Sequence, residues 1–211
     1  MRKLIVILFG LLLVGCDKEV STITDDITSP EMRKVTPMDH HFLVEWLSDA
    51  MDRGNHDFDT GTHGELVIDP KSAPLERGDV VYYKMFETAI KKNPEIPKNY
   101  LGRVVGLPGE TIEIKDGHVY IDHKKLDTFY GVATIRGMEE EEYLDQADLS
   151  HVNDLAWVKS YFNFNLEPIK VDEETVFVLV DHWWRGTDSK DFGLLPMERI
   201  QGKVLGYSDE F

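Results

Sequence analysis

Side chains that could bind a metal ion crowd one short segment of this 211-residue chain. They are His56, Asp57, Asp59, His63 and Glu65. Imidazole and carboxylate groups ligate zinc and other divalent ions, so this set could form a metal site. The same stretch is rich in Asn, Asp and Gly, whose polar side chains commonly cap turns. Because it lacks a spaced motif of the His-Glu-x-x-His kind, we favour a surface loop and expect neither a metal nor another cofactor.

Three other clusters could take part in binding. We interpret His40 and His41 as the solvent-facing edge of a linker. Trp183 and Trp184 could stack on a ligand or partner, but aromatic residues beside a strand end usually pack, and we favour packing. The acidic run Glu139–Glu142 predicts a solvated helix start, because negative charge suits a helix N-terminus. A metal or partner site there is the less favoured interpretation.

The only cysteine, Cys16, follows a basic start and a short apolar run, Leu4–Val14. A helix needs about 20 apolar residues to span a bilayer, so this run is too short to do so and is typical of an export signal. Leu13–Cys16 (LVGC) resembles the lipobox of bacterial lipoproteins. That resemblance implies cleavage before Cys16 and lipidation of its thiol. An ordinary signal peptide that contains a cysteine is the alternative.

Three segments resemble, in order, the sequence boxes of type I signal peptidases. Arg77–Lys84 (RGDVVYYK) is similar to their Arg-Gly-Asp-Ile-Val-Val-Phe-Lys box. Tyr100–Glu110 (YLGRVVGLPGE) is similar to Tyr-Ile-Lys-Arg-Val-Val-Gly-Leu-Pro-Gly-Asp, and Asp181–Gly193 is similar to the box that ends Asp-Ser-Arg-x-x-Gly. Gly117–Asp122 resembles the hairpin that follows the second box. The residues that carry the resemblance are Arg77, Gly78, Asp79, Arg103, Gly106, Pro108, Gly109, Asp188, Ser189 and Gly193.

The resemblance implies a definite chemistry and location. In this family a serine hydroxyl attacks the peptide carbonyl, a buried lysine with a depressed pKa acts as general base, and neighbouring donors hold the oxyanion. The substrate lies extended along a sheet edge, with small side chains in two pockets. Family members cut signal peptides at the outer face of the membrane.

Both chemical positions differ in this chain. The resemblance places Ala50 at the nucleophile and Gly102 at the general-base lysine, while Ser48 falls at the oxyanion position and Met51 on the family methionine. His182-Trp183 stands where the family has Asn-Arg, and Lys190 stands where it has arginine. A methyl group and a hydrogen atom supply neither nucleophile nor base. We therefore expect a pseudoenzyme that still binds extended peptide or preprotein segments.

Two alternatives assign the nucleophile position to other residues. A second register sets Gly64-Glu65 on the family's Gly-Asp, with His56 at the nucleophile position and Thr60 on its threonine. A working serine endopeptidase could instead use Ser48 as the nucleophile, activated by Lys84 or Lys98. A buried lysine amine within hydrogen-bond reach of Ser48 would favour this second alternative.

The elements that must position these residues are mainly β. We expect strands at Glu65–Ile68, Asp79–Lys84, Gly102–Gly106, Thr111–Lys115, His118–Ile121, Thr175–Val180 and Ile200–Tyr207, with an earlier one within His41–Leu47. Asp116-Gly117 is typical of a hairpin turn. Leu144, Ala147, Leu149, Val152, Leu155 and Val158 roughly follow helical spacing, which predicts one or two helices between Met138 and Ser160.

The fold expected is a signal-peptidase-like β-barrel or sheet domain with a small helical insertion. We divide the chain into a signal peptide (1–15), a lipid-anchored linker (16–40) and the folded domain (41–211), with the helical insertion at 131–170. The formal charge of −16 disfavours nucleic acid as a partner. The membrane, reached through the lipid on Cys16, is the expected partner. The expected location is the outer face of the bacterial cytoplasmic membrane.

Overall fold

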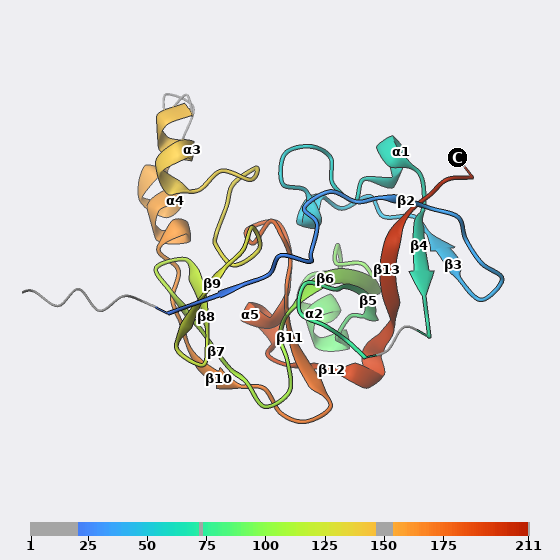
Figure 1. The fold of residues 1–211 in the computed structure, drawn as a ribbon. Coiled ribbons are helices and arrows are strands. Elements are labelled where there is room, and N and C mark those ends of the chain that lie inside the picture. The colour runs from blue at the N-terminus through green and yellow to red at the C-terminus, as the bar shows by residue number, and fades with distance from the viewer. Residues whose placement is uncertain (1–20, 72–73, 147–153, 211) are drawn as a thin grey trace, which may run out of the picture.

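The computed structural model describes residues 21–71, 74–146 and 154–210, and its strands form two sheets (Figure 1). The strands of the larger sheet are, in spatial order, β12 (Leu195–Pro196), β11 (Thr175–Leu179), β6 (Asn99–Gly106), β5 (Val80–Lys84), β13 (Ile200–Ser208), β4 (Leu66–Asp69) and β3 (Phe42–Val44), with β2 (Lys34–Val35) beside β13. The smaller sheet holds β1 (Thr22–Thr24), β9 (Lys124–Asp127), β8 (His118–Ile121), β7 (Thr111–Lys115) and β10 (Leu166–Lys170). Strand pairs are antiparallel except β1 with β9 and β2 with β13.

The helices are short and lie between strands. They are α1 (Thr60–His63), α2 (Glu87–Lys92), α3 (Glu140–Gln146), α4 (Leu155–Phe162) and α5 (Ser189–Phe192), with 3-10 turns η1 (Asp49–Met51) and η3 (Met197–Arg199). Helix α4 buries Val158 and Phe162 against the smaller sheet. Within the described ranges, no helix combines the length and apolar character needed to cross a membrane.

Strand β11 serves two hydrophobic cores at once. Successive side chains of a strand point to opposite faces. Val176 and Val178 therefore pack into the core of the larger sheet, whereas Phe177 and Leu179 pack into the core under the smaller sheet. This burial on both faces explains why the sequence of β11 is continuously apolar rather than alternating.

The chain passes from the larger to the smaller sheet at Gly106, where β6 ends. A Cβ atom at this position would lie 2.6 Å from Cγ1 of Ile112 and 2.9 Å from Cβ of Phe177. Only glycine permits that approach without displacing a neighbour. The turn that follows holds Pro108 and Gly109, and the Gly109 N–H donates to the Val171 carbonyl at 2.9 Å.

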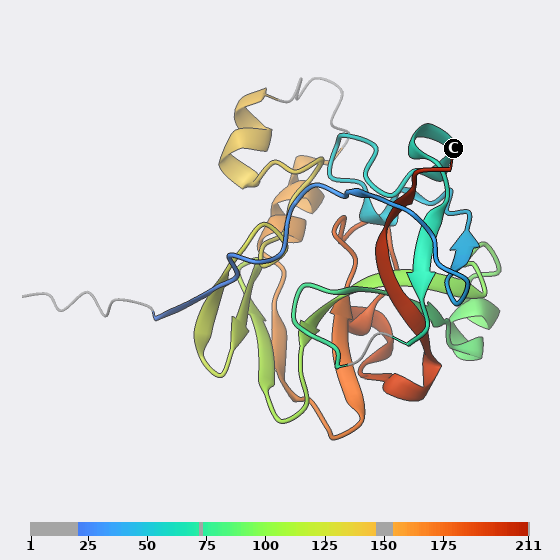
Figure 2. The same cartoon turned by 45° about the vertical axis from the view of Figure 1, so that its right-hand side comes forward.

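Residues 21–36 differ from the free linker expected for this part of the chain. They pair with both sheets through β1 and β2, and the segment between these strands crosses the molecule (Figure 2). At Gly78 a Cβ atom would lie 2.0 Å from Oγ1 of Thr28, so the crossing is close. Partial burial raises the pKa of Asp25, but hydrogen bonds from Thr28 and Tyr130 outweigh it and lower that pKa to about 2. Strands of two or three residues are too short to show a periodic pattern of apolar residues. The sequence of this segment was therefore interpreted as a linker.

The main expectations about the fold are confirmed, with different boundaries. Each expected strand is present, and the β7–β8 hairpin turns at Asp116 and Gly117, which both have positive φ. The region 131–170 contains α3 and α4, but its last residues form β10 of the smaller sheet. The acidic run does begin α3. Val158 of the helical stripe is buried, whereas Leu155 is 38% exposed; positions 147–153 lie outside the described residues.

Candidate functional site

Ala50, at the expected nucleophile position, lies buried in the core of the larger sheet. It belongs to η1, whose N-cap is Ser48, and its carbonyl accepts a hydrogen bond from the His182 N–H at 2.9 Å. The loop after β11 covers it closely, since a Cβ atom on Gly186 would lie 3.0 Å from that of Ala50. Ala50 is therefore a packed backbone turn with no reactive atom.

Gly102, at the expected lysine position, lies within β6 and faces the same core. A Cβ atom there would be 3.3 Å from both Cε1 of Tyr83 and Cβ of Val178. Burial raises the pKa of Tyr83 well above its ordinary value, and its buried hydroxyl has no hydrogen-bond partner. A phenol with a raised pKa is a poor base at neutral pH. The Tyr83 ring therefore occupies the space beside Gly102 without replacing the lysine chemically.

Within the described part of the chain, Ser48 lacks the lysine partner that a relocated dyad would need. Its hydroxyl accepts the Ala50 N–H at 3.3 Å and caps η1. Lys84 and Lys98 are exposed, although Lys98 lines the same groove as Ser48. Lys190 is more deeply buried, but its amine pairs with Asp188. Among the residues that the structure describes, no lysine amine hydrogen-bonds Ser48.

Residues of the third box build the frame of the site. Asp188 is the N-cap of α5, and its carboxylate also accepts the Val180 N–H at 3.1 Å. The Ser189 hydroxyl accepts the Val178 N–H at 2.9 Å, next to the space beside Gly102. Gly193 ends α5 with φ of +85°. Burial raises the pKa of Asp188, although Lys190 opposes this shift. These contacts hold α5 against β11.

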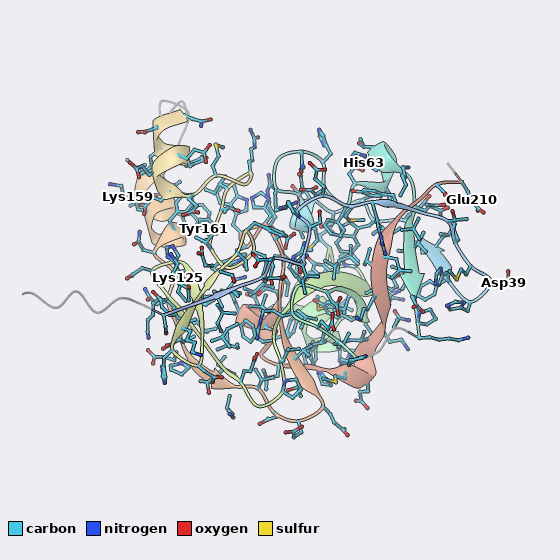
Figure 3. The ribbon with its side chains drawn as sticks, viewed as in Figure 1. Asp39, His63, Lys125, Lys159, Tyr161 and Glu210 are labelled. Carbon is cyan, nitrogen blue, oxygen red and sulfur yellow. The ribbon has the colours of Figure 1, made fainter. Side chains whose placement is uncertain are left out.

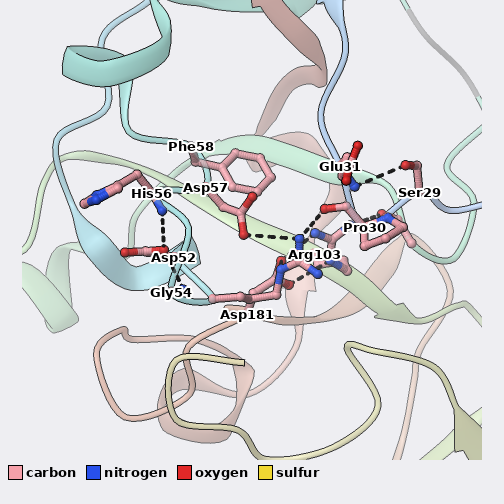
Figure 4. A network of polar contacts seen from close by, with 12 residues as sticks. Ser29, Pro30, Glu31, Asp52, Gly54, His56, Asp57, Phe58, Arg103 and Asp181 are labelled. Carbon is pink, nitrogen blue, oxygen red and sulfur yellow. Dashed lines mark hydrogen bonds and ion pairs between the residues drawn. The ribbon is translucent and has the colours of Figure 1, made fainter. Parts of the chain in front are cut away.

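A buried network of two arginines and two aspartates lies on the other side of β6 (Figure 4). Arg103 holds Asp181 with two hydrogen bonds, of 2.7 Å from Nε and 2.5 Å from Nη2, and donates to the Gly78 carbonyl. Burial lowers the pKa of Arg103, but the charge of Asp181 outweighs it and the net shift is upward. Arg53 lies 3.2 Å from Asp57 and 3.8 Å from Asp181. The sequence analysis assigned no role to Arg53.

The first box makes similar structural contacts. Arg77 forms a two-point ion pair with Glu110, and Asp79 pairs with Lys203 at 2.7 Å. The segment His56–Glu65, which we interpreted as a surface loop rather than a metal site, uses two of its carboxylates in local contacts. Asp57 pairs with Arg53, and Asp59 caps α1.

An open groove of about 850 Å³ runs beside these positions. Its walls come from three segments: Glu45–Ser48, Asn93–Tyr100 and Trp184–Thr187, with Tyr82 between them. Trp184 is 37% exposed and packs against Trp157 of α4, with ring centroids 4.7 Å apart. Trp183, by contrast, is buried, as packing predicts. The helical insertion thus supports one wall of the groove through Trp184.

His182 contacts Ala50 through its backbone N–H and Trp184 of the groove wall through its ring. Its ring stacks on Trp184 at 5.9 Å, and its Nε2 is buried without a hydrogen-bond partner. Burial, and then the charge of Arg185, lower the pKa of His182. The ring is therefore neutral at pH 7. Cys16 and the expected signal peptide lie outside the described residues.

Comparison with known proteins identifies similar sequences. The family model described as "Signal peptidase, peptidase S26" matches residues 3–207. The chain is 27% identical over 132 residues to signal peptidase I of Leptolyngbya laminosa, covering 63% of this chain and 52% of that protein. It is 26% identical to probable signal peptidase I-1 of Synechocystis, covering 63% and 54%. The chain therefore spans about half the length of these two relatives.

Further similarities come from other bacteria. Signal peptidase IB of Staphylococcus aureus is 28% identical over 138 residues, with 65% of this chain and 63% of that protein covered. Among solved structures, a signal peptidase I from Enterococcus faecalis V583 aligns with a TM-score of 0.39 and 25% sequence identity. That alignment covers 63% of this chain and 97% of the other.

Proposed function

Because the chain belongs to the peptidase S26 signal peptidase family, we propose that it is a signal-peptidase-like protein that binds extended peptide segments without cutting them. One observation carries this proposal: the two positions where the chemistry would occur are Ala50 and Gly102, packed into an apolar core beside an open groove. A serine dyad needs a hydroxyl and a neutral amine, and these residues offer neither. Removing one member of such a unit already costs most of the rate.

The backbone of β6 supports peptide binding. Pairing of β11 with β6 extends from Gly106 to Arg103, whereas pairing of β5 with β6 continues to Asn99. The first residues of β6 thus reach past the end of β11, and Asn99 and Tyr100 line the groove. An extended segment could add to this strand by main-chain hydrogen bonds, with side-chain pockets giving selectivity.

The proposal includes a lipid anchor. Lipidation of Cys16 would hold the domain at the outer face of the bacterial cytoplasmic membrane, where extended preprotein segments emerge. Acyl chains rather than basic residues would provide the attachment, because the chain carries a net charge of −16. The same charge argues against nucleic acid as a partner.

An active serine endopeptidase is the second candidate function. It is favoured by one observation, that Ser48 and Lys98 line the same groove. Lys98 is exposed, however, whereas this chemistry requires a buried lysine. The hydroxyl of Ser48 is also engaged with the Ala50 N–H.

A cleavage assay separates the two candidates. The full chain in detergent micelles is incubated with a preprotein, and products are read by mass spectrometry. Three proteins are compared: the wild type, Ser48→Ala, and the double variant Ala50→Ser with Gly102→Lys. We expect no cleavage by the wild type. Cleavage that disappears in Ser48→Ala would overturn the proposal and identify the nucleophile.

Peptide binding is measured in parallel with a fluorescent signal-peptide segment. Leu47 is 78% exposed and lines the groove, so Leu47→Arg should weaken binding by at least about tenfold, which corresponds to 1.4 kcal/mol. Ile27 is 92% exposed on the crossing segment, outside the groove, and Ile27→Arg serves as the matched control. Absence of binding by the wild type, or equal effects of both variants, would contradict the peptide-binding role.

A further inference from the structure

The turn before β3 and the end of β4 bring two histidines and an aspartate together at the edge of the larger sheet. In the β3–β4 ladder Phe42 pairs with Ile68, so the same antiparallel register sets His41 opposite Asp69. Nε2 of His40 lies 3.6 Å from Oδ1 of Asp69, and the rings of His40 and His41 are in edge contact at 4.3 Å. One ligand atom from each of the three residues lies within 4.8 Å of the others.

We propose that His40, His41 and Asp69 bind a divalent transition-metal ion of the Zn²⁺ class. Two imidazoles and one carboxylate are a ligand set that zinc accepts, with water in a fourth position. The nitrogen ligands favour zinc or copper over magnesium or calcium, which prefer oxygen. All three side chains are half-buried, so each is partly ordered while one side stays open to solvent.

The local structure holds the ligands near one another before any ion arrives. His41 closes a turn in which its N–H donates to the Met38 carbonyl at 2.9 Å. Asp69 ends β4, and its Oδ1 accepts the Lys71 N–H at 2.8 Å. These contacts fix the backbone on both sides of the site, which lowers the ordering cost of binding.

Metal binding would break one local hydrogen bond, and the loss of that bond can be measured. Nδ1 of His41 accepts the Met38 N–H at 3.1 Å, so the neutral ring carries its proton on Nε2. Ligation through either nitrogen of this ring displaces that exposed hydrogen bond. The amide of Met38 therefore changes its environment when the ion binds, whereas a simple His40–Asp69 ion pair would leave it unchanged.

The site lies apart from the positions of the missing dyad but is linked to the groove. Asp39 marks the turn that holds the two histidines, at the opposite end of the molecule from Lys159 and Tyr161 of α4 (Figure 3). Strand β3 begins directly after His41 and continues into Glu45–Ser48, one wall of the groove. An ion that ties the start of β3 to the end of β4 would stiffen this wall.

The test is a Zn²⁺ titration by calorimetry on the full chain in detergent micelles, free of any polyhistidine tag. We expect one ion per chain. His40→Ala, His41→Ala and Asp69→Asn should each weaken binding by at least about tenfold, in the range known for altered metal sites. Asn at position 69 can still accept the Lys71 N–H, so this variant keeps the turn while losing the charge.

The chain offers a matched control in His123. This histidine lies 3.3 Å from Glu113, a His–carboxylate pair without a second imidazole. His123→Ala should leave Zn²⁺ binding unchanged. Circular dichroism checks that every variant is folded. Cu²⁺ then serves as a spectroscopic probe, and its electron paramagnetic resonance spectrum should show coupling to two imidazole nitrogens.

Two results would overturn the proposal. One is the absence of Zn²⁺ binding by the wild type at about 100 µM metal, a concentration that would reveal any site of useful affinity. The other is Zn²⁺ binding of wild-type affinity in each of the two single variants, His40→Ala and His41→Ala. Zinc titration of protein labelled with ¹⁵N-methionine gives an independent readout: a Met38 amide that does not move contradicts ligation by His41.

Discussion

Gly102 and Arg103 are neighbours on β6, yet they belong to regions that are built in different ways. Arg103 enters a buried charged network with Asp181, Arg53 and Asp57. Gly102 faces the opposite side, where Tyr83 and Val178 leave an apolar, tightly packed space. Alternate side chains of a strand point to opposite faces. The charged network around Arg103 and the position expected to hold the lysine therefore lie in separate environments. The difference shows that one strand can carry a buried charged network on one face and a tightly packed apolar core on the other.

The largest expected loss of stability comes from breaking the buried charged network around Arg103. Arg103→Met leaves the buried Asp181 without its two-point partner, and we expect a loss of about 3–5 kcal/mol in the free energy of unfolding. Urea denaturation measures this loss. Arg185→Ala is the control, because its ion pair with Asp49 is half-exposed on both sides and should contribute only about 0–1 kcal/mol. Equal losses in the two variants would mean that the buried network has no special structural role.

The apolar region should resist a lysine side chain at position 102. Gly102→Lys forces a long side chain against Tyr83 and Val178, and we expect it to destabilise the protein by about 1–3 kcal/mol. Adding Tyr83→Val to this variant removes the ring and should recover part of the loss, as read from denaturation midpoints. If Gly102→Lys alone has wild-type stability, the space beside β6 is larger than the structure indicates.

Removing the Tyr83 hydroxyl should raise the stability of the protein, by a smaller amount. Tyr83→Phe removes a buried polar group that has no partner, so we expect a gain of about 1 kcal/mol in stability. Tyr100→Phe is its counterpart, because the Tyr100 hydroxyl accepts the Thr187 N–H at 3.3 Å. That variant should be less stable than the wild type. A loss of stability in Tyr83→Phe would show that its hydroxyl has a partner in solution.

The smallest expected change in stability depends on pH and comes from His182, in the loop that covers Ala50. Burial lowers the pKa of His182 in the folded protein below the ordinary value of about 6.5, so the unfolded chain takes up its proton more readily. The stabilising contribution of the neutral ring is therefore complete above the unfolded pKa and declines as the pH falls below about 6.5. Melting temperatures of the wild type should drop more between pH 7.5 and pH 5 than those of His182→Gln. Parallel curves would contradict this origin of the pH dependence.

Local patterns predicted much of the fold. Alternating or continuous apolar runs predicted strands such as β7 and β11, and Asp116-Gly117 predicted the hairpin between β7 and β8. The short strands β1, β2, β9 and β12 were missed, because segments of two to four residues are too short to carry a periodic signal. Within 131–170, β10 was missed because helical spacing next to it dominated that stretch.

The candidate site was predictable only in part. The boxes pointed to Ala50, Gly102 and the loop around Asp188. They did not show that Tyr83 occupies the space beside Gly102, or that Arg53 joins the Arg103–Asp181 pair. Arg53 is one of several charged residues in its loop, and only the tertiary fold brings it to the buried Asp181.

By itself, the sequence determined the family resemblance, the mainly β class and the presence of Ala50 and Gly102 where the resemblance expects a serine and a lysine. These are properties of residue identity and short-range order. The tertiary structure decided the rest: the crossing of residues 21–36 over Gly78, the position of the Tyr83 ring beside Gly102, and the meeting of His41 with Asp69. Each of these joins residues distant along the chain, and such contacts depend on how strands pair and pack rather than on any local pattern.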